Sequence, residues 1–307
     1  MRLLGSLYLF IAASIWGGMY VVTKYVLEYI PPLTLLVMRL AIALVIFGGL
    51  AAWRREWRVA KRDRLLLASL GLIGFTLSLG FQFWGTKLSS AHNGGLITSA
   101  SPAFIVLFAF WLLKERLSVS KLASLGLATA GVLAVVGPEA GAAPGAGGGA
   151  VALGNLCLVG AAVTWALYTV LGKVATERYS SLTVSLYATL AGLLFTIPIA
   201  LATEGLALQP VPPLVWWGVA YVGVISTAVA FYLWVRGFSM VDAGTGSLFF
   251  FAQPLVAAVL GALLLQEKLH WYFFLGAGLI FAGVGLSALQ GSGGHEAADH
   301  PASSKRA

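Results

Sequence analysis

The chain has 307 residues, of which 59% are hydrophobic and only 10% are charged, and its formal net charge is +8. Soluble domains carry about 25% charged residues, so this composition excludes a soluble globular protein and predicts a polytopic membrane protein. A transmembrane barrel is also excluded, because its strands would alternate polar and apolar residues instead of staying apolar for about 20 residues.

Ten apolar stretches are each long enough to cross a bilayer, which takes about 20 residues in a helix. The first follows Met1 and Arg2 directly, and we interpret it as a span because it is too long for the core of a typical signal peptide. We therefore predict an all-α polytopic membrane protein with ten transmembrane helices, at residues 4–25, 33–53, 65–87, 94–113, 120–137, 152–172, 182–203, 214–236, 246–265 and 271–289.

Basic residues are concentrated in alternate connections between these helices. The largest group lies at 54–64, between the second and third predicted helices. The positive-inside rule then places this connection and both termini in the cytoplasm. Because the basic run adjoins a span, we interpret it as a topology determinant and expect no nucleic-acid partner.

The chain repeats itself at an interval of about 150 residues. The motif LLKERL at 112–117 returns as LLQEKL at 264–269, an offset of 152. Three residues in and just after the first helix also recur, at an offset of 149: Trp16, Lys24 and Glu28 return as Trp165, Lys173 and Glu177. Five helices separate each element from its copy, so the copies have opposite orientations in the bilayer, as in alternating-access transporters.

The repeats define the predicted domain organisation. We expect a first five-helix repeat at 1–137 and a second, inverted repeat at 152–290. Between them, the glycine-rich segment 138–151 has the composition of a flexible linker, placed outside the membrane. The segment 291–307 is predicted to be a disordered cytoplasmic tail.

This organisation resembles the drug/metabolite transporter superfamily, in its ten-helix EamA-type exporter family. The resemblance rests on Trp16–Gly18 with Lys24, on Arg39 after a Pro-Pro turn, and on the repeated Pro…Glu-(Arg/Lys)-Leu element. It implies a cavity lined by helices 1–4 and 6–9, export of small metabolites across a bacterial-type inner membrane, and no cofactor.

Two prolines occupy equivalent positions in the fourth and ninth predicted helices. Pro102 and Pro254 each lie about nine residues into their helix, where proline removes a backbone hydrogen bond and kinks the helix. Gly94 and Gly244 would soften the same elements, so we predict hinges there. Lys24 and Lys173 are candidates for gating, with snorkelling and pairing to the glutamate four residues later as the alternative.

Arg39 is the only charge well within a predicted span. An intramembrane charge is costly and is a functional candidate by default. A guanidinium could bind a substrate carboxylate through two hydrogen bonds. The alternatives are a structural ion pair, for example with Glu28, or snorkelling toward the membrane surface.

Aromatic and amide side chains are frequent in the helices assigned to the cavity. Aromatic walls with a few polar groups suit small amphipathic ligands, although interface-belt and packing roles are the alternative. Trp16, Trp165 and Gln253 fall on repeated elements and are the strongest candidates. Together with Arg39, the predicted substrate-binding residues are Trp16, Tyr20, Gln82, Trp84, Asn93, Trp165, Tyr168, Tyr232 and Gln253.

We therefore expect a secondary transporter that exports small metabolites, such as amino acids or related amphipathic compounds. A passive facilitator or channel and a multidrug or cation exporter are the alternatives. An intramembrane enzyme is disfavoured because no deep Asp, Glu or His accompanies Arg39. We expect no metal site and no phosphate-binding loop for ATP hydrolysis. The expected partners are a small-molecule substrate and the lipid bilayer, and the oligomeric state stays open.

Overall fold

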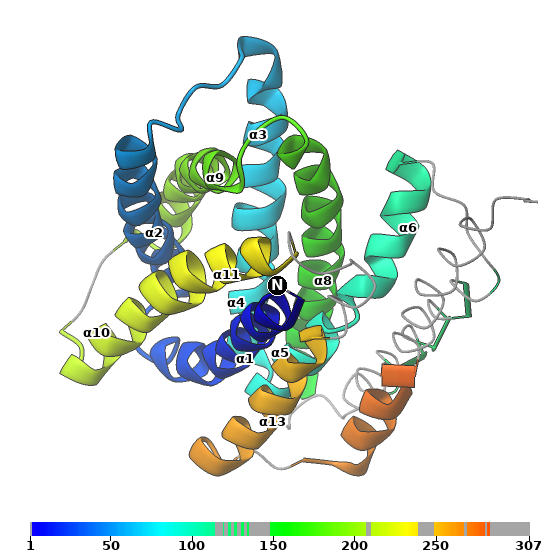
Figure 1. Cartoon of the computed structure of the whole chain (residues 1–307). Helices are drawn as coiled ribbons and strands as arrows, with labels where there is room; N and C mark the ends of the chain where they lie inside the picture. Colours follow the sequence, from blue (N-terminus) through cyan, green and yellow to red (C-terminus); the bar gives the residue numbers. More distant parts are fainter. Residues whose placement is uncertain are drawn as a thin grey trace, which may run out of the picture.

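A computed structural model shows that the chain folds into packed helices (Figure 1). It describes residues 2–113, 148–206, 210–238, 249–266, 269–279 and 281–282, with isolated positions between 119 and 134. These residues contain no strand. Within them, seven helical segments are long and apolar enough to cross a membrane, and an eighth apolar helix is shorter. The predicted all-helical membrane fold is confirmed.

Several of the spans are built from consecutive helical segments of different geometry. The first four spans contain α1 (Arg2–Val26), α2 (Pro32–Arg54), η1 (Lys61–Asp63), α3 (Arg64–Leu70), η2 (Gly71–Ser78), α4 (Leu79–Leu88), α5 (Ala91–Thr98) and α6 (Ser101–Leu113). The later spans contain α8 (Gly148–Thr176), α9 (Ser181–Thr203), α10 (Pro213–Ala220), η3 (Tyr221–Val229), α11 (Ala230–Phe238), η4 (Phe249–Phe251) and α13 (Ala252–Leu264). A further helix covers 271–279.

The remaining predicted elements are only partly described. The helix expected at 120–137 is described at isolated positions, and that at 271–289 is described as far as residue 282. Residues 138–147 of the predicted linker 138–151 and the whole predicted tail 291–307 lie outside the described residues, whereas 148–151 already belong to α8. The domain boundaries at these places stay predictions.

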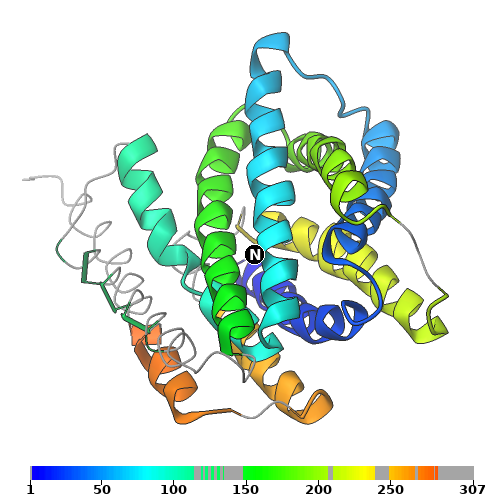
Figure 2. The same cartoon turned by 180° about the vertical axis from the view of Figure 1, so that it is seen from behind.

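The equivalent helices α2 and α9 of the two repeats lie side by side and run antiparallel (Figures 1 and 2). Glu204, which follows α9, accepts hydrogen bonds from the backbone amides of Leu33 and Thr34 at the start of α2, at 3.0 and 2.8 Å. Reciprocally, the carbonyl of Glu56, which follows α2, accepts a hydrogen bond from the hydroxyl of Thr183 at the start of α9. Two copies of one helix in antiparallel contact are what inverted repeats require.

The Glu204 contact gives a test of how the repeats are held together. Its carboxylate accepts hydrogen bonds from two backbone amides that have no partner within the helix. Its negative charge also interacts favourably with the positive end of the α2 dipole. We expect Glu204→Ala to lower the free energy of unfolding by about 1 kcal/mol, measured by thermal unfolding in detergent. Glu28→Ala is the control, because the Glu28 side chain is exposed and forms no hydrogen bond with the described residues. Equal stability of the two variants would contradict the assigned role.

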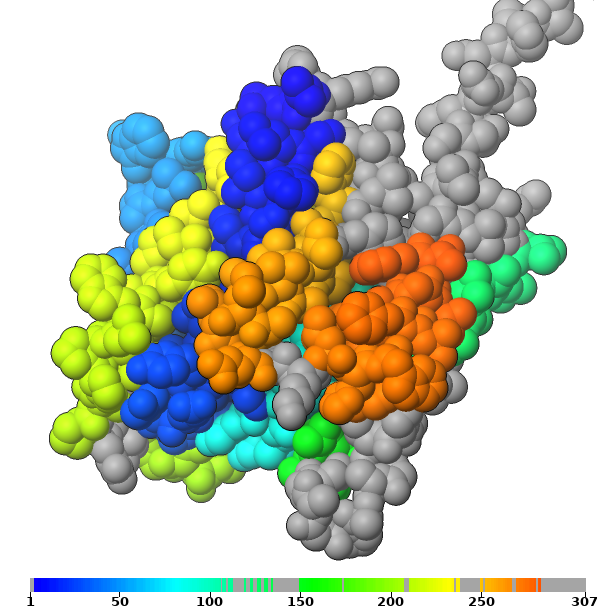
Figure 3. Space-filling model, turned by 90° about the horizontal axis from the view of Figure 1, so that it is seen from below, coloured from blue at the N-terminus to red at the C-terminus, as the bar shows by residue number. Residues whose placement is uncertain are grey.

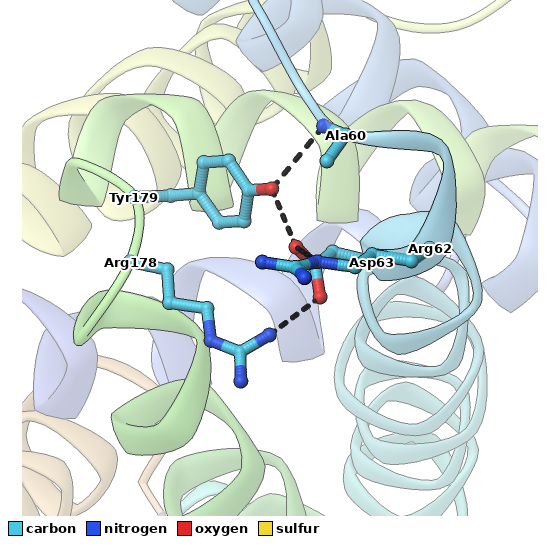
Figure 4. A network of polar contacts seen from close by, with 5 residues as sticks. All are labelled: Ala60, Arg62, Asp63, Arg178 and Tyr179. Carbon is cyan, nitrogen blue, oxygen red and sulfur yellow. Dashed lines mark hydrogen bonds and ion pairs between the residues drawn. The ribbon is translucent and has the colours of Figure 1, made fainter.

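The opposite face of the molecule carries a second contact between the repeats (Figure 4). Asp63 of the first repeat accepts a bond from Arg178 at 2.8 Å and from the Tyr179 hydroxyl at 2.7 Å. The same hydroxyl accepts a hydrogen bond from the backbone amide of Ala60 at 3.2 Å. The Nε of Arg62 lies 3.6 Å from the Asp63 carboxylate. The connection after α2, which contains part of the basic run, is therefore fastened to the connection between α8 and α9.

Glycines let helices of different repeats approach closely. A Cβ at Gly237 would lie 2.7 Å from Leu9, and one at Gly218 would clash with Val26. The end of α11 thus packs on the start of α1, while α10 packs on the end of α1. Figure 3 shows the α1 segment between the yellow α10–α11 segment and the gold α13 segment.

The helix that contains Pro102 is broken rather than kinked, which corrects the prediction. Residues 99–100 form a turn between α5 and α6, and Pro102 is the second residue of α6. Proline is tolerated in the first turn of a helix because its missing N–H would be unpaired there. The Ser101 hydroxyl donates to the Thr98 carbonyl at 2.6 Å, the carbonyl that residue 102 would otherwise have bound. Pro254 likewise lies in the first turn of α13.

Two π-helical segments, which the hydropathy pattern did not predict, lie at equivalent places in the repeats. η2 and η3 begin at Gly71 and Tyr221, an offset of 150. A π-helix has a wider turn than an α-helix, is rare, and frequently occurs at functional sites. Both segments contribute polar groups to the centre of the molecule, as described next.

Candidate functional site

A cavity of about 40 Å³ lies between the two repeats. Its lining is mixed, with aromatic rings, two amides, hydroxyls and one guanidinium. The first repeat contributes Trp16, Met19, Arg39, Ser78, Leu79, Gln82, Thr98 and Ser101. The second repeat contributes Ala161, Trp165, Phe231, Phe250 and Gln253. The volume suffices for two or three water molecules, whereas pockets that enclose organic ligands measure about 300–1,000 Å³.

A polar network joins the two repeats at the cavity wall. The Tyr20 hydroxyl lies 2.6 Å from the Thr98 hydroxyl and accepts a bond from Gln82 at 2.6 Å. Gln253 of the second repeat donates to the Tyr20 and Thr98 hydroxyls at 3.1 and 3.0 Å. Tyr20 is therefore the centre of the network, although its own side chain does not line the cavity.

Helix α5 is held tightly against its neighbours at this network. The Tyr20 ring packs against Gly94, where a Cβ would lie 2.5 Å from the ring. A Cβ at Gly95 would lie 2.5 Å from the Ala257 Cβ of α13. All eight residues of α5 are buried. The close packing explains why this broken helix needs glycines, and the predicted hinge role of Gly94 stays a prediction.

Trp16 is the centre of an aromatic cluster at the cavity. Its ring centroid lies 5.0–6.2 Å from those of Trp165, Phe231, Trp234 and Phe250, which all belong to the second repeat. Its indole nitrogen donates to the Ser226 carbonyl in η3 at 2.9 Å. The Trp16 ring thus packs against the second repeat and also forms part of the cavity wall.

Arg39 is fully buried in α2 and lines the cavity. Its Nε donates to the Thr227 hydroxyl in η3 at 2.5 Å, and its guanidinium carbon lies 5.5 Å from the centroid of the Phe83 ring. No carboxylate of the described residues pairs with it, and Glu28 is exposed at the end of α1. The structural alternatives of a Glu28 ion pair and of snorkelling are therefore wrong for Arg39.

Lys24 fastens the end of α1 to the end of α4. Its ammonium donates to the carbonyls of Thr86 and Lys87 at 3.0 and 2.9 Å and also to the Ser89 carbonyl. A cation there satisfies carbonyls that have no partner within the helix and complements the helix dipole. The predicted pairing with Glu28 is replaced by this capping role. Lys173 lies in α8, and Gly244 lies outside the described residues.

Five of the ten predicted substrate-binding residues line the cavity: Trp16, Arg39, Gln82, Trp165 and Gln253. Tyr20 is bonded to this group, and the Tyr168 ring lies 5.1 Å from that of Trp165. Asn93 is buried outside the lining, where its amide donates to the Ser89 hydroxyl at 3.2 Å. Trp84 and Tyr232 are 40% and 43% exposed on the outer surface. For these residues, the substrate role stays a prediction without support from the geometry.

The prediction missed several lining residues. Thr98 and Ser101 flank the helix break, and hydroxyls close to the repeated proline were a usable signal. Ser78 reaches the cavity at the end of η2 and donates to the Ala161 carbonyl at 3.1 Å. Met19, Leu79, Ala161, Phe231 and Phe250 are apolar residues in apolar helices, so nothing in the sequence separated them from lipid-facing neighbours.

Comparisons with known proteins agree with this architecture. The model of the EamA-like transporter family matches residues 3–137 and 152–289, one match in each half. The chain is 28% identical over 282 residues to the uncharacterized transporter YetK of Bacillus subtilis, covering 91% of this chain and 85% of YetK.

A transporter of unknown function from Archaeoglobus fulgidus is also 28% identical, over 276 residues, covering 89% of this chain and 93% of that protein. A solved crystal structure of another protein aligns with a TM-score of 0.68 at 23% identity. The alignment covers 94% of this chain and 97% of that chain, and it shows a shared fold.

Proposed function

Because the chain belongs to the EamA-like transporter family, we propose that it is a secondary transporter that exports small metabolites by alternating access. The preferred substrates are amino acids or related amphipathic compounds. The membrane is the bacterial-type inner membrane, with both termini in the cytoplasm, as the positive-inside rule indicates. Membership of the family makes the protein a membrane transporter.

The observation that carries the proposal is the position of the cavity. It lies between the repeats and is lined by both. The α5–α6 break and η2 contribute lining residues, and η3 binds two of them, Trp16 and Arg39. Irregular backbone within a membrane is tolerated where it is buried in protein or lines a cavity, and transporters with inverted repeats bind their substrates at such places.

The small volume of the cavity favours a carrier that moves around its substrate. An amino acid does not fit into about 40 Å³, so binding requires displacement of the lining helices. At the two faces, the repeats are joined by discrete polar contacts, such as Glu204 with the start of α2 and Asp63 with Arg178 and Tyr179. Contacts of this kind can break and re-form as the repeats rock against each other.

Counterflow in proteoliposomes tests the function. With a panel of radiolabelled amino acids, we expect saturable uptake that unlabelled amino acid inside the vesicles stimulates. A passive facilitator or channel would show neither saturation nor stimulation. Uptake of lipophilic cations without uptake of any amino acid would instead support the multidrug exporter.

Gln253→Leu is expected to reduce counterflow by about fivefold or more, because a hydrogen bond to a substrate or to the network around it contributes about 1 kcal/mol or more. Tyr20 and Thr98 keep their mutual bond in this variant. Leu255→Ala, two residues later on the outer side of α13 and 63% exposed, is the matched control. Wild-type counterflow in Gln253→Leu, at equal protein in the vesicles, would contradict the site assignment.

A further inference from the structure

We propose that two side chains of the cavity recognise the two ends of a zwitterion: Arg39 binds the carboxylate of the transported solute, and Gln82 accepts a hydrogen bond from its amino group. The inference rests on the proposed function and gives its substrate class a structural basis. It starts from two buried polar atoms that line one cavity and lack partners among the described residues, Arg39 Nη1 and Gln82 Oε1.

The Arg39 guanidinium is held in one orientation, and no carboxylate among the described residues pairs with it. Thr227 fixes its Nε, and the Phe83 ring lies against it, so the side chain cannot turn away without losing both contacts. Its Nη1 is buried and has no acceptor in the part of the chain described. A buried charge without a counter-charge is strongly unfavourable. A carboxylate in the cavity supplies the missing charge and the missing acceptor together.

The Gln82 amide presents the opposite chemistry. Its Nε2 donates to the Tyr20 hydroxyl at 2.6 Å, which leaves Oε1 as a buried acceptor without a donor. An unsatisfied buried acceptor costs about as much as a lost hydrogen bond. An ammonium group is the donor that complements it, and it belongs to the same molecule as the carboxylate in an amino acid.

The rest of the lining suits the side chain of such a solute. Trp16, Trp165 and Phe231 form an aromatic wall next to the polar groups. The same charge argument disfavours the cation exporter, because a simple cation would meet Arg39 with no acidic group of the described lining to offset the repulsion.

Ligand-dependent thermal unfolding of the purified protein tests the recognition without requiring transport. The probes are L-alanine, propionate, L-alaninamide and sodium chloride at equal concentrations. Propionate lacks the amino group of alanine, and alaninamide lacks its carboxylate. We expect the largest rise in unfolding temperature with alanine, a smaller rise with propionate, and none beyond the salt control with alaninamide.

Variants of Arg39 test whether this residue binds the carboxylate of alanine. Arg39→Gln is expected to weaken alanine binding by roughly 10- to 100-fold, the effect of losing a hydrogen bond to a charged group. Arg39→Lys keeps the charge but loses the planar donor geometry, so it should retain part of the binding. If neither variant folds, the comparison of the four probes on the wild-type protein still decides.

Each other outcome overturns a defined part of the proposal. Equal shifts with alanine and alaninamide, or no shift with alanine up to its solubility, would reject the carboxylate site at Arg39. A chloride shift equal to that of alanine would assign the site to an inorganic anion instead. Equal shifts with alanine and propionate would reject the role of Gln82. Alanine binding without counterflow of any amino acid would leave the site standing and reject the transport function.

Discussion

Trp16→Ala is expected to abolish counterflow and to lower the free energy of unfolding by about 3–5 kcal/mol, as for other buried aromatic residues replaced by alanine. Trp16 is 5% exposed, and its ring touches four aromatic rings of the second repeat. Removing it leaves a void where the repeats meet and also removes one wall of the binding cavity. Thermal unfolding in detergent and counterflow in proteoliposomes measure the two effects.

Two matched variants separate packing from substrate contact. Trp16→Phe keeps an aromatic ring but loses the indole bond to the Ser226 carbonyl, so we expect a loss of about 1 kcal/mol. Trp217→Ala removes a tryptophan that is 74% exposed, and its stability should remain near that of the wild type. If Trp16→Ala unfolds at the same temperature as Trp217→Ala, the cluster does not hold the repeats together.

Gly17→Ala is expected to destabilise the protein by about 1–3 kcal/mol, the usual cost of overpacking a well-packed interior. A Cβ at Gly17 would lie 2.5 Å from the Gln253 carbonyl oxygen and 2.8 Å from the Val256 Cβ. The carbonyl belongs to the backbone of α13 and cannot rotate away, so α1 and α13 must separate. Because this shift displaces Gln253 from Tyr20 and Thr98, counterflow should fall with the stability.

Gly49→Ala is the control for the glycine prediction. Gly49 lies within α2, and an added Cβ there would meet no described atom within 4 Å apart from its chain neighbours and the nearby backbone of its own helix. Alanine is a better helix former than glycine by about 1 kcal/mol in water, so this variant should be at least as stable as the wild type. The same loss in both variants would show that helix packing at Gly17 is not the cause.

The repeat interval in the sequence correctly indicated inverted copies. Residues of the α2 and α9 regions are related by an offset of about 149 to 150, and the structure shows these helices in antiparallel contact at both ends. The prediction succeeded because a duplicated chain with an odd number of spans per copy must reverse its direction in the membrane. It did not indicate that Glu56 and Glu204 would form the contacts.

The break between α5 and α6 shows where local reasoning failed. Pro102 was interpreted as a kink because proline removes one hydrogen bond from a continuous helix. The structure instead begins a new helix at Ser101 and uses its hydroxyl to satisfy the Thr98 carbonyl. The choice between kink and break depends on the surroundings, here the tight packing of α5 against Tyr20 and Ala257.

Hydropathy and self-similarity alone determined that this chain is a helical membrane protein with a duplicated architecture, because span length and internal repetition are properties of the linear sequence. Only the tertiary structure decided which polar groups meet at the centre. Arg39 forms a hydrogen bond with Thr227, which is 188 residues away in the sequence, and Tyr20 forms one with Gln253, which is 233 residues away. Such contacts depend on how apolar helices pack, and apolar helices of similar composition carry little local information about which face turns inward.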